Sequence, residues 1–321
     1  MNNEGSPDSE YEKLKNSNFK QQKLPAWRPV PTITSTFLTF IVFGVAFIVI
    51  GIVVIIYSNE IQEISKTYHN IDGCKINEIC EVEFTLNTTM YAPVMVYYQL
   101  NNFYQNHRRY VKSKSNDQLK GKILQESDLK SECEPIVTMK DLGKLTTVDG
   151  TVLKETDVAN PCGLIAKSFF NDEYKLDNKN GTNVKISEEG IAWEADKDMK
   201  YGRPVDPEGK NPDYWKKIQW TDVMNEHFMV WMRPAGLPNF RKLWGRIEED
   251  MPAGNYVFKI NNNYDVEPFK GEKFIVISEV NAFGGKNSFL GISYLVVGSI
   301  CIVLAIAFCI GYKIHNPKKE N

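Results

Sequence analysis

Two long apolar stretches interrupt a chain that is otherwise polar. Residues 37–57 and 289–312 contain no Asp, Glu, Lys or Arg. As helices rising about 1.5 Å per residue, they would extend roughly 31 Å and 36 Å, enough to cross a hydrocarbon core of about 30 Å. A long helix on the surface of a soluble protein has a polar face, and neither stretch shows one. We therefore predict two membrane-spanning helices.

The first apolar stretch is expected to be an uncleaved anchor rather than a signal peptide. Residues 1–36 precede it, which is long for the charged start of a signal peptide. The residues after it, "SNEIQE", contain no small-x-small cleavage site. This stretch should therefore remain in the mature protein.

The charges that flank the two spans predict their orientation. Basic residues come before the first span and after the second, and they favour the cytosolic side; they are Lys13, Lys15, Lys20, Lys23, Arg28, Lys313, Lys318 and Lys319. Lys286, just before the second span, is a mild exception. The predicted order is a cytosolic, largely disordered tail (1–36), a span (37–57), a luminal or extracellular domain (58–287), a span (288–312) and a cytosolic tail (313–321).

Four of the six cysteines lie in the predicted luminal or extracellular domain, an even number that suits an oxidising compartment. They allow three pairings, and proximity in sequence favours Cys74–Cys80 and Cys133–Cys162. A zinc site is the alternative, but no pair has CxxC spacing and only His69, His107 and His227 are available as further ligands. Cys301 and Cys309 lie in the second span, where a thiol behaves as a small apolar group.

The N-x-S/T pattern occurs twice in the chain, at Asn87-Thr88-Thr89 and Asn180-Gly181-Thr182. Both matches lie in the same domain as the four cysteines, so we expect N-linked glycans at Asn87 and Asn180. We expect no cofactor or metal besides these glycans.

The region between the spans is expected to contain more strand than helix. Alternating or β-branched runs predict strands at residues 81–86, 95–100, 255–260 and 272–280. The clearest predicted helix is "PNFRKLWGRIEED" (238–250), where Phe240, Leu243, Trp244 and Ile247 have the spacing of one helical face. A helix, or a strand followed by a turn, fits the stretch that begins at Val96. Residues 111–160 and 195–218 are rich in Lys, Asp, Gly and Pro and are expected to be irregular connections.

The composition and motifs give no support for catalysis or nucleic-acid binding. The formal net charge is -2, which provides no basic surface for nucleic acid. The sequence contains no G-x-x-x-x-G-K-[ST], H-E-x-x-H or G-x-S-x-G motif. Asp196-Lys197 begins like the phosphorylated motif of ion-pumping ATPases but continues Asp198-Met199-Lys200. We therefore expect a protein that is not an enzyme.

Each predicted span carries two glycines seven residues apart: Gly44 and Gly51 in the first, Gly291 and Gly298 in the second. Seven residues turn a helix by about 700°, so each pair lies on one face. Small residues there allow close packing against another helix, although glycine is also simply frequent in membrane helices. No ionisable group lies in either span, which argues against an ion or proton pathway.

Several long motifs, in order along nearly the whole chain, carry a family resemblance. They include "FKQQKLPAWRPVPT" (19–32), "YYQLNNFYQNHRRYVKS" (97–113), "NPCGLIAKSFFNDEYKL" (160–176), "IAWEADKDMKYGRP" (191–204) and "FMVWMRPAGLPNFRKLWGRIEEDMPAGNYVFKINNNYDV" (228–266). The sequence resembles the cell division control protein 50 / ligand-effect modulator family, the β-subunits of type IV P-type ATPases. Some members have a third pair of luminal cysteines, which this chain lacks.

The resemblance implies a membrane protein with two transmembrane helices and a glycosylated, disulfide-bonded ectodomain built on an antiparallel β-sandwich. It implies a non-catalytic subunit that binds an ATP-hydrolysing α-subunit, enables its exit from the endoplasmic reticulum and supports phospholipid transport to the cytosolic leaflet. The expected partners are that α-subunit and membrane lipids. The expected location is the endoplasmic reticulum, the Golgi or endosomes, or the plasma membrane.

Under this reading, residues 160–176 mainly brace the ectodomain. Cys162 would tie a turn to Cys133, the apolar side chains of Leu164, Ile165, Phe169 and Phe170 would enter the core, and Lys167, Asn171 and Asp172 would remain available to the partner. Most of the remaining tryptophans are expected to be core residues rather than interface anchors; they are Trp215, Trp220, Trp231 and Trp244. Trp27 is a candidate interfacial anchor before the first span.

The C-terminal "KKEN" has the form of a dilysine retrieval signal, through Lys318 and Lys319. The alternative is that these lysines are only a positive cytosolic flank. Two other functions stay open at this point: a two-span ligand-gated channel subunit, and an ectoenzyme or glycan-binding receptor. Against a channel, the two spans offer few polar side chains that could line a pore. Against an ectoenzyme, the region between the spans shows no catalytic constellation.

Overall fold

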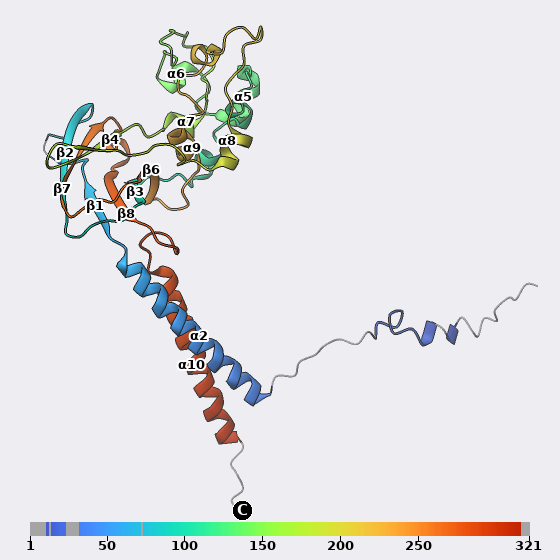
Figure 1. Cartoon of the computed structure of the whole chain (residues 1–321). Coiled ribbons are helices and arrows are strands. Elements are labelled where there is room, and N and C mark those ends of the chain that lie inside the picture. Colours follow the sequence, from blue (N-terminus) through green and yellow to red (C-terminus); the bar gives the residue numbers. More distant parts are fainter. Residues whose placement is uncertain (1–10, 13, 24–31, 72, 316–321) are drawn as a thin grey trace, which may run out of the picture. The chain divides into compact units, whose positions relative to one another are not determined.

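A computed structural model describes residues 11–12, 14–23, 32–71 and 73–315 (Figure 1). The chain divides into two compact units, one containing the two long helices and the other spanning residues 56–288. Trp27, Lys318 and Lys319 lie outside the described residues.

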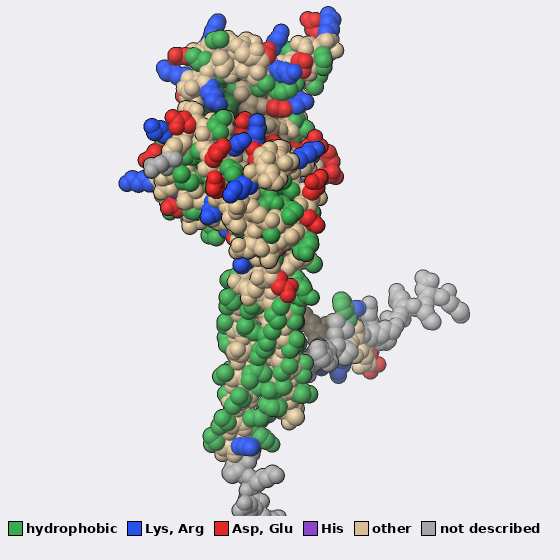
Figure 2. All heavy atoms as spheres, turned by 60° about the vertical axis from the view of Figure 1, so that its left-hand side comes forward, with side chains coloured by type: hydrophobic (Ala, Val, Ile, Leu, Met, Phe, Trp, Pro, Cys, Tyr) green, Lys and Arg blue, Asp and Glu red, His purple; other side chains and the backbone are tan. Residues whose placement is uncertain are grey.

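The first unit contains the helices α2 (Ile33–Glu60) and α10 (Phe289–His315). Both are long and apolar enough to cross a membrane. In their most apolar windows only 17% and 11% of the residues are buried, so these are not the core helices of a soluble domain. Figure 2 shows hydrophobic side chains covering this helical pair, whereas charged side chains of both signs are scattered over the other unit. The predicted pair of membrane helices is confirmed, each a few residues longer than expected.

The second unit is a β-rich domain built on two four-stranded antiparallel sheets. The strand order of the first sheet is β1 (Glu63–Thr67), β8 (Glu272–Glu279), β3 (Val94–Asn101) and β6 (Phe240–Ile247). The order of the second is β2 (Glu78–Leu86), β7 (Gly254–Asn262), β4 (Glu173–Asn178) and β5 (Asn183–Val184). The expected fold class, two membrane helices with an antiparallel β-rich domain, is confirmed.

Alternation of side chains along the strands builds the core between the sheets. In β2, Val82, Phe84 and Leu86 are buried and the residues between them are exposed, as a strand with one solvated face requires. Phe84 stacks on Phe258 of the neighbouring β7 with ring centroids 5.4 Å apart. These pairs fix the register, because a slip of one residue would turn the apolar set outward.

The helix predicted at residues 238–250 is wrong, since Phe240–Ile247 form strand β6. Phe240 and Trp244 are buried at strand spacing, but the register against β3 shifts between Val96 and Tyr97, leaving Trp244 out of the paired residues. This bulge changes the phase of the alternation, so that Ile247 is also buried. The combination imitates the i, i+4, i+7 spacing of a helix.

Short helices fill most of the connections that were expected to be irregular. They are α3 (Arg108–Lys112), α4 (Asn116–Leu119), α5 (Glu126–Cys133), α6 (Met139–Leu142), α7 (Leu164–Lys167), α8 (Glu194–Lys200), η1 (Tyr214–Lys217), α9 (Glu226–Met232) and η2 (Glu267–Phe269). Local polar side chains set their ends; Thr138 and Asp141, for example, form a capping box at α6. The helices α5 to α9 gather beside the sheets in Figure 1, although they come from two separate insertions.

Candidate functional site

Residues 160–176 join the helical insertions to the sheets. Cys162 is disulfide-bonded to Cys133 at the end of α5, the pairing that proximity in sequence favoured. The backbone N–H of Cys162 donates to Oε1 of Gln118 (2.9 Å), and the amide of Gln118 donates to the carbonyl of Ala159 (3.1 Å). All of these groups are buried, so the start of the segment is held by a covalent bond and by satisfied polar contacts.

Gly163 permits the close approach on which this junction depends. Its φ is +101°, and a Cβ placed on it would lie 2.1 Å from the carbonyl oxygen of Ser113. The hydroxyl of Ser113 accepts from the N–H of Leu164 (2.8 Å) and donates to the carbonyl of Cys133 (2.8 Å). Any side chain at position 163 would push these two chain segments apart.

The apolar residues of the segment enter the core, as expected. Ile165 and Phe170 are buried, while Leu164 and Phe169 are partly buried against the core. Phe170 stacks on Tyr98 of β3 with ring centroids 3.9 Å apart. The segment is therefore a structural brace through most of its length.

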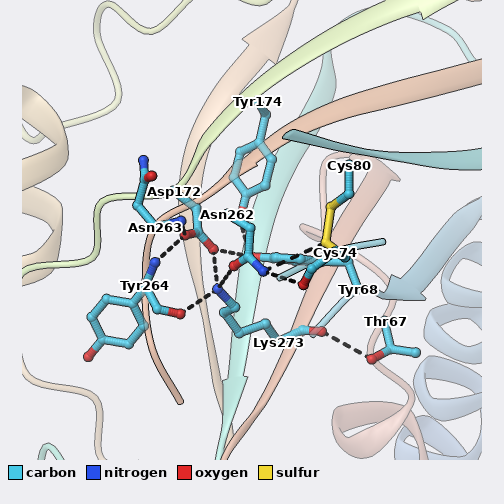
Figure 3. The surroundings of a disulfide bond; sticks show 10 residues. All are labelled: Thr67, Tyr68, Cys74, Cys80, Asp172, Tyr174, Asn262, Asn263, Tyr264 and Lys273. Carbon is cyan, nitrogen blue, oxygen red and sulfur yellow. Dashed lines mark hydrogen bonds and ion pairs between the residues drawn. A yellow bond between two sulfur atoms is a disulfide. The ribbon is translucent and has the colours of Figure 1, made fainter. Parts of the chain in front are cut away.

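Asp172 is not available to a partner, which corrects the prediction. It is buried at 3% exposure, and its Oδ2 lies 2.7 Å from Nζ of Lys273 (Figure 3). Lys167 and Asn171 are exposed, although the ammonium of Lys167 donates to the carbonyl of Asp141. A short polar residue next to an exposed asparagine looks like surface in the sequence, because its partner lies 101 positions away.

The buried ion pair is surrounded by hydrogen-bonding groups from several elements. Asp172 Oδ1 accepts from the N–H groups of Asn263 and Tyr264 (2.6 Å each), and Oδ2 accepts from the hydroxyl of Tyr68 (2.7 Å). The ammonium of Lys273 also donates to the side chain of Asn262 and to the carbonyl of Tyr264. Burial lowers the pKa of Lys273, and the carboxylate opposes that shift. Every charge here has partners, as a buried pair requires.

The second disulfide lies beside this cluster. Cys74 is bonded to Cys80 in β2, closing the short loop that leads into this strand. The amide of Asn262 donates to the carbonyl of Cys74 (2.8 Å) while its oxygen accepts from Lys273 (Figure 3). The loop, the central strand β7 and the ion pair therefore form one connected unit.

The clearest candidate for a binding surface lies over α8, α9 and β6. Its most exposed aromatic side chain is Trp193, at 66% exposure, with the guanidinium of Arg233 stacked 4.0 Å from the ring centroid. A cavity of about 340 Å³ adjoins them, lined by Ile191, Ala192, Trp193, Asp196, Met229, Val230, Arg233, Pro234, Ala235, Arg241, Lys242 and Leu243. We call these residues the Trp193 surface.

Ion pairs and hydrogen bonds of charged side chains hold the Trp193 surface in place. Asp196 is buried and accepts from Arg233, while Lys200 binds its other oxygen at 2.7 Å. The hydrogen bond from Arg233 is the main reason that the pKa of Asp196 falls to about 2. Nζ of Lys242 donates to the carbonyl of Val230 (2.8 Å) and to those of Trp231 and Arg233 at the end of α9. Burial lowers the pKa of this buried lysine to about 7. An aromatic face, a fixed cation and an apolar floor suit recognition of another protein.

The four predicted glycines meet at the contact between α2 and α10. A Cβ on Gly51 would lie 2.9 Å from the carbonyl oxygen of Gly291, and one on Gly298 would lie 2.9 Å from that of Gly44. A Cβ on Gly44 or Gly291 would also approach a side chain of the other helix within 2.8 Å. The glycines therefore let these two helices pack backbone to backbone.

The remaining predicted residues are placed as follows. Asn87 and Asn180 are exposed, Asn87 directly after β2 and Asn180 in the turn between β4 and β5. The tryptophans Trp215, Trp220, Trp231 and Trp244 are buried, so they are core residues. Within the described residues, no group of three or more His, Cys, Asp or Glu side chains is placed to hold a metal ion. Sequence reasoning missed Trp193 as a surface residue; its neighbours in "AWEADKDMK", mostly charged, were the available signal.

The family model and the curated relatives that the chain matches point to the same family. The model of the LEM3 (ligand-effect modulator 3) family / CDC50 family matches residues 53–319. The chain is 38% identical to ALA-interacting subunit 3 of Arabidopsis thaliana over 95% of this chain and 87% of that one. It is 37% identical to Cell cycle control protein 50A of Bos taurus (94% and 90% covered) and 32% identical to Cell cycle control protein 50B of Homo sapiens (95% of each).

Proposed function

The chain belongs to the LEM3 (ligand-effect modulator 3) / CDC50 family, and from that membership we propose that it is the non-catalytic β-subunit of a phospholipid flippase. Its partner would be a type IV P-type ATPase, which hydrolyses ATP and moves phospholipid from the exoplasmic to the cytosolic leaflet. The observation that carries the proposal is the family match over residues 53–319, which includes the β-rich domain, the last part of α2 and the whole of α10. The name of the plant relative, an interacting subunit, supports an accessory role.

In this proposal both termini are cytosolic and the β-rich domain is luminal or extracellular. The disulfides Cys74–Cys80 and Cys133–Cys162 support that location, because such bonds persist in oxidising compartments. The basic residues before α2 and after α10 support the same orientation. The protein would work in the endoplasmic reticulum and then in the Golgi, endosomal or plasma membrane.

The β-rich domain would hold the α-subunit by its luminal loops, and the Trp193 surface is a candidate for part of that contact. Tryptophan and arginine are the residue types that most often dominate binding energy at interfaces, and here Arg233 is already oriented by Asp196. The other charged residues of the surface are already engaged within the chain: Arg241 pairs with Glu63, and Lys242, whose pKa burial lowers to about 7, donates to backbone carbonyls. The surface therefore offers a partner mainly the aromatic face of Trp193 and the guanidinium of Arg233.

The complex would assemble in the endoplasmic reticulum, and the β-subunit would enable the α-subunit to leave it and complete its transport cycle. Lys318 and Lys319 would act as a retrieval signal that assembly masks. Replacing both by serine should then release the unpartnered protein from the endoplasmic reticulum. Unchanged retention of the double variant would show that the two lysines are only a charged flank.

The experiment that tests the proposal is purification of the tagged full-length chain in detergent. Mass spectrometry would identify the proteins that accompany it, and the eluate would be assayed for ATPase activity stimulated by phospholipid. Recovery of a type IV ATPase with that activity is the expected result. Recovery of a homo-oligomer without ATPase activity would contradict the proposal and favour a two-span channel subunit, which current recordings in bilayers would then test.

A further inference from the structure

Both N-x-S/T sequences of the chain lie beside one groove of the β-rich domain. The groove has a volume of about 700 Å³ and is lined by Ile64, Lys66, Glu83, Phe84, Thr85, Asn87, Lys179, Asn255, Tyr256 and Val257. Asn87 is therefore part of its wall, and Asn180 directly follows Lys179 in another part of the wall. We call this cavity the seam groove.

Strand register explains why two distant sequences meet here. β2 ends at Leu86, opposite Gly254 at the start of β7. On the other side of β7, β4 ends at Asn178, opposite Tyr256, and the N–H of Lys179 donates to the carbonyl of Asn255 (2.9 Å). The acceptor asparagines thus emerge at the same end of the second sheet, on either side of the first residues of β7.

The seam groove lies between the free edges of the two sheets. Ile64 and Lys66 belong to β1, the edge strand of the first sheet, and Phe84 and Thr85 belong to β2, the edge strand of the second. β2 is a nine-residue strand that pairs only with β7 in the described part of the chain. Alternate N–H and C=O groups of such a strand face outward, ready to pair with another chain unless something covers them.

The lining of the seam groove suits a carbohydrate better than an apolar ligand. The hydroxyl of Thr85 donates to the side-chain oxygen of Asn255 (2.7 Å), which leaves the amide of Asn255 as a donor toward the groove. Lys66 and Lys179 add ammonium donors, and Glu83 adds a carboxylate acceptor. Hydroxyl groups of a sugar can bond to every one of these, and the volume falls in the usual range of roughly 300–1,000 Å³ for small-molecule sites.

We propose that Asn87 carries an N-linked glycan whose first sugars lie in the seam groove and cover the free edge of β2. The inference rests on the proposed luminal location, because only there is the chain glycosylated. The occupant is the chain's own glycan, since Asn87 is exposed and is itself a lining residue, so the sugar is tethered at the entrance. The glycan of Asn180 extends from the neighbouring turn and shields the side of Lys179.

This arrangement assigns a role to the glycan besides solubility. It closes an edge that would otherwise accept a strand from another copy of the chain or from an unrelated protein. It also means that the α-subunit binds elsewhere on the domain, because a sugar-filled groove cannot at the same time receive a protein loop.

The test is lysine labelling of the full-length protein purified from eukaryotic cells together with its accompanying subunit. Mass spectrometry first determines whether Asn87 is modified. The protein is then labelled with an amine-reactive reagent before and after removal of the N-glycans by a peptide N-glycosidase under native conditions. We expect labelling of Lys66 to rise several-fold on deglycosylation, while Lys154, an exposed lysine outside the groove, stays unchanged.

Variants make the assignment specific to Asn87. Asn87→Gln should expose Lys66 to labelling, Asn180→Gln should affect Lys179 and leave Lys66 protected, and Thr89→Ser keeps the acceptor pattern and should behave as the wild type. If Asn87 is unmodified in the wild type, this proposal fails, and glycosylation of Asn180 then decides whether the luminal location stands. If Asn87 is glycosylated but Lys66 is labelled equally with and without the sugar, the seam-groove proposal fails while the proposed function stands.

Discussion

Nζ of Lys273 lies 2.7 Å from Oδ2 of Asp172, and neither side chain is exposed to solvent. Lys273 belongs to β8 of the first sheet, whereas Asp172 lies at the end of the bracing segment, just before β4 of the second. The ion pair therefore links the two sheets through the core. Its value depends on both partners, because a single buried charge without its partner is costly.

We expect Lys273→Met or Asp172→Asn alone to destabilise the β-rich domain by about 3–5 kcal/mol, since each leaves an unpaired buried group. The double variant should lose less than the sum, because it removes both charges. Thermal unfolding of the purified protein measures this, with Lys175→Met on the exposed face of β4 as the control. Additive losses in the double variant would show that the two residues are not coupled.

The two disulfides should differ in their contribution to stability. Cys133–Cys162 joins residues 29 apart and Cys74–Cys80 residues 6 apart. The loop-entropy model gives about 3–4 kcal/mol for a loop of the longer kind and less for a shorter one. We expect the pair Cys133→Ser/Cys162→Ser to lower the unfolding temperature and the yield more than Cys74→Ser/Cys80→Ser. The opposite order would mean that the small loop beside the buried ion pair matters more than chain entropy.

Gly298→Val should disrupt the contact between α2 and α10, because its Cβ would lie 2.9 Å from the backbone oxygen of Gly44. Overpacking of this kind costs about 1–3 kcal/mol. Gly311→Val is the matched control on the same helix, since a Cβ there meets nothing within 4 Å. Unfolding temperature in detergent and recovery of the accompanying subunit measure the effect. Equal behaviour of the two variants would rule out a special role for the glycine contact.

Trp193→Ala should weaken association with the proposed α-subunit without unfolding the domain. Trp193 is largely exposed, so its loss removes little core packing, whereas an interface tryptophan contributes enough to weaken binding about tenfold or more. Tyr91→Ala is the control, because Tyr91 is exposed to the same extent (67%, against 66% for Trp193) but lies outside the Trp193 surface. Co-purification of the ATPase gives the readout. Undiminished recovery with the Trp193 variant would place the contact elsewhere.

The ion pair between Asp196 and Arg233 predicts that the domain loses stability at low pH. The pKa of Asp196 falls to about 2 in the folded protein, below its ordinary value of 3.8. The unfolded chain therefore binds this proton first as the pH decreases, so the stabilisation is complete above about pH 4 and is lost as the pH falls towards 2. Unfolding temperatures measured between pH 5 and 2 should fall less steeply for Asp196→Asn than for the wild type. Parallel curves would mean that this carboxylate does not link protonation to folding.

The parts of the fold that depend on local pattern could be predicted from the sequence. The uncharged stretches predict the membrane helices α2 and α10, and the alternation at residues 81–86 predicts strand β2. The structure confirms each of these predictions. Strand β6 was mistaken for a helix because a bulge at Trp244 shifts the alternation. A bulge depends on the partner strand, so it has no separate signal in the strand that carries it.

The residues of the candidate site could not be predicted from the sequence, because their roles depend on contacts between distant segments. Asp172 was expected at the surface, since nothing near it in the sequence announces a buried lysine from β8. Trp193 was overlooked because an exposed aromatic residue and a buried one look alike without the tertiary structure. The seam groove likewise exists only because β1 and β2 come to lie at the edges of different sheets.

The position of β8 has a consequence for the order of events during biosynthesis. β8 is the last of the described strands along the chain, yet it lies between β1, the first of them, and β3. Before β8 has been synthesised, no strand lies between β1 and β3 in the first sheet. Asp172 then has no buried lysine to pair with. The domain therefore cannot reach its final form before residues 272–279 have been synthesised, a delay expected when distant segments must pair. A truncated or stalled chain would therefore expose an unpaired strand edge and an unpaired charge, the kind of surface that makes an incomplete domain prone to aggregate.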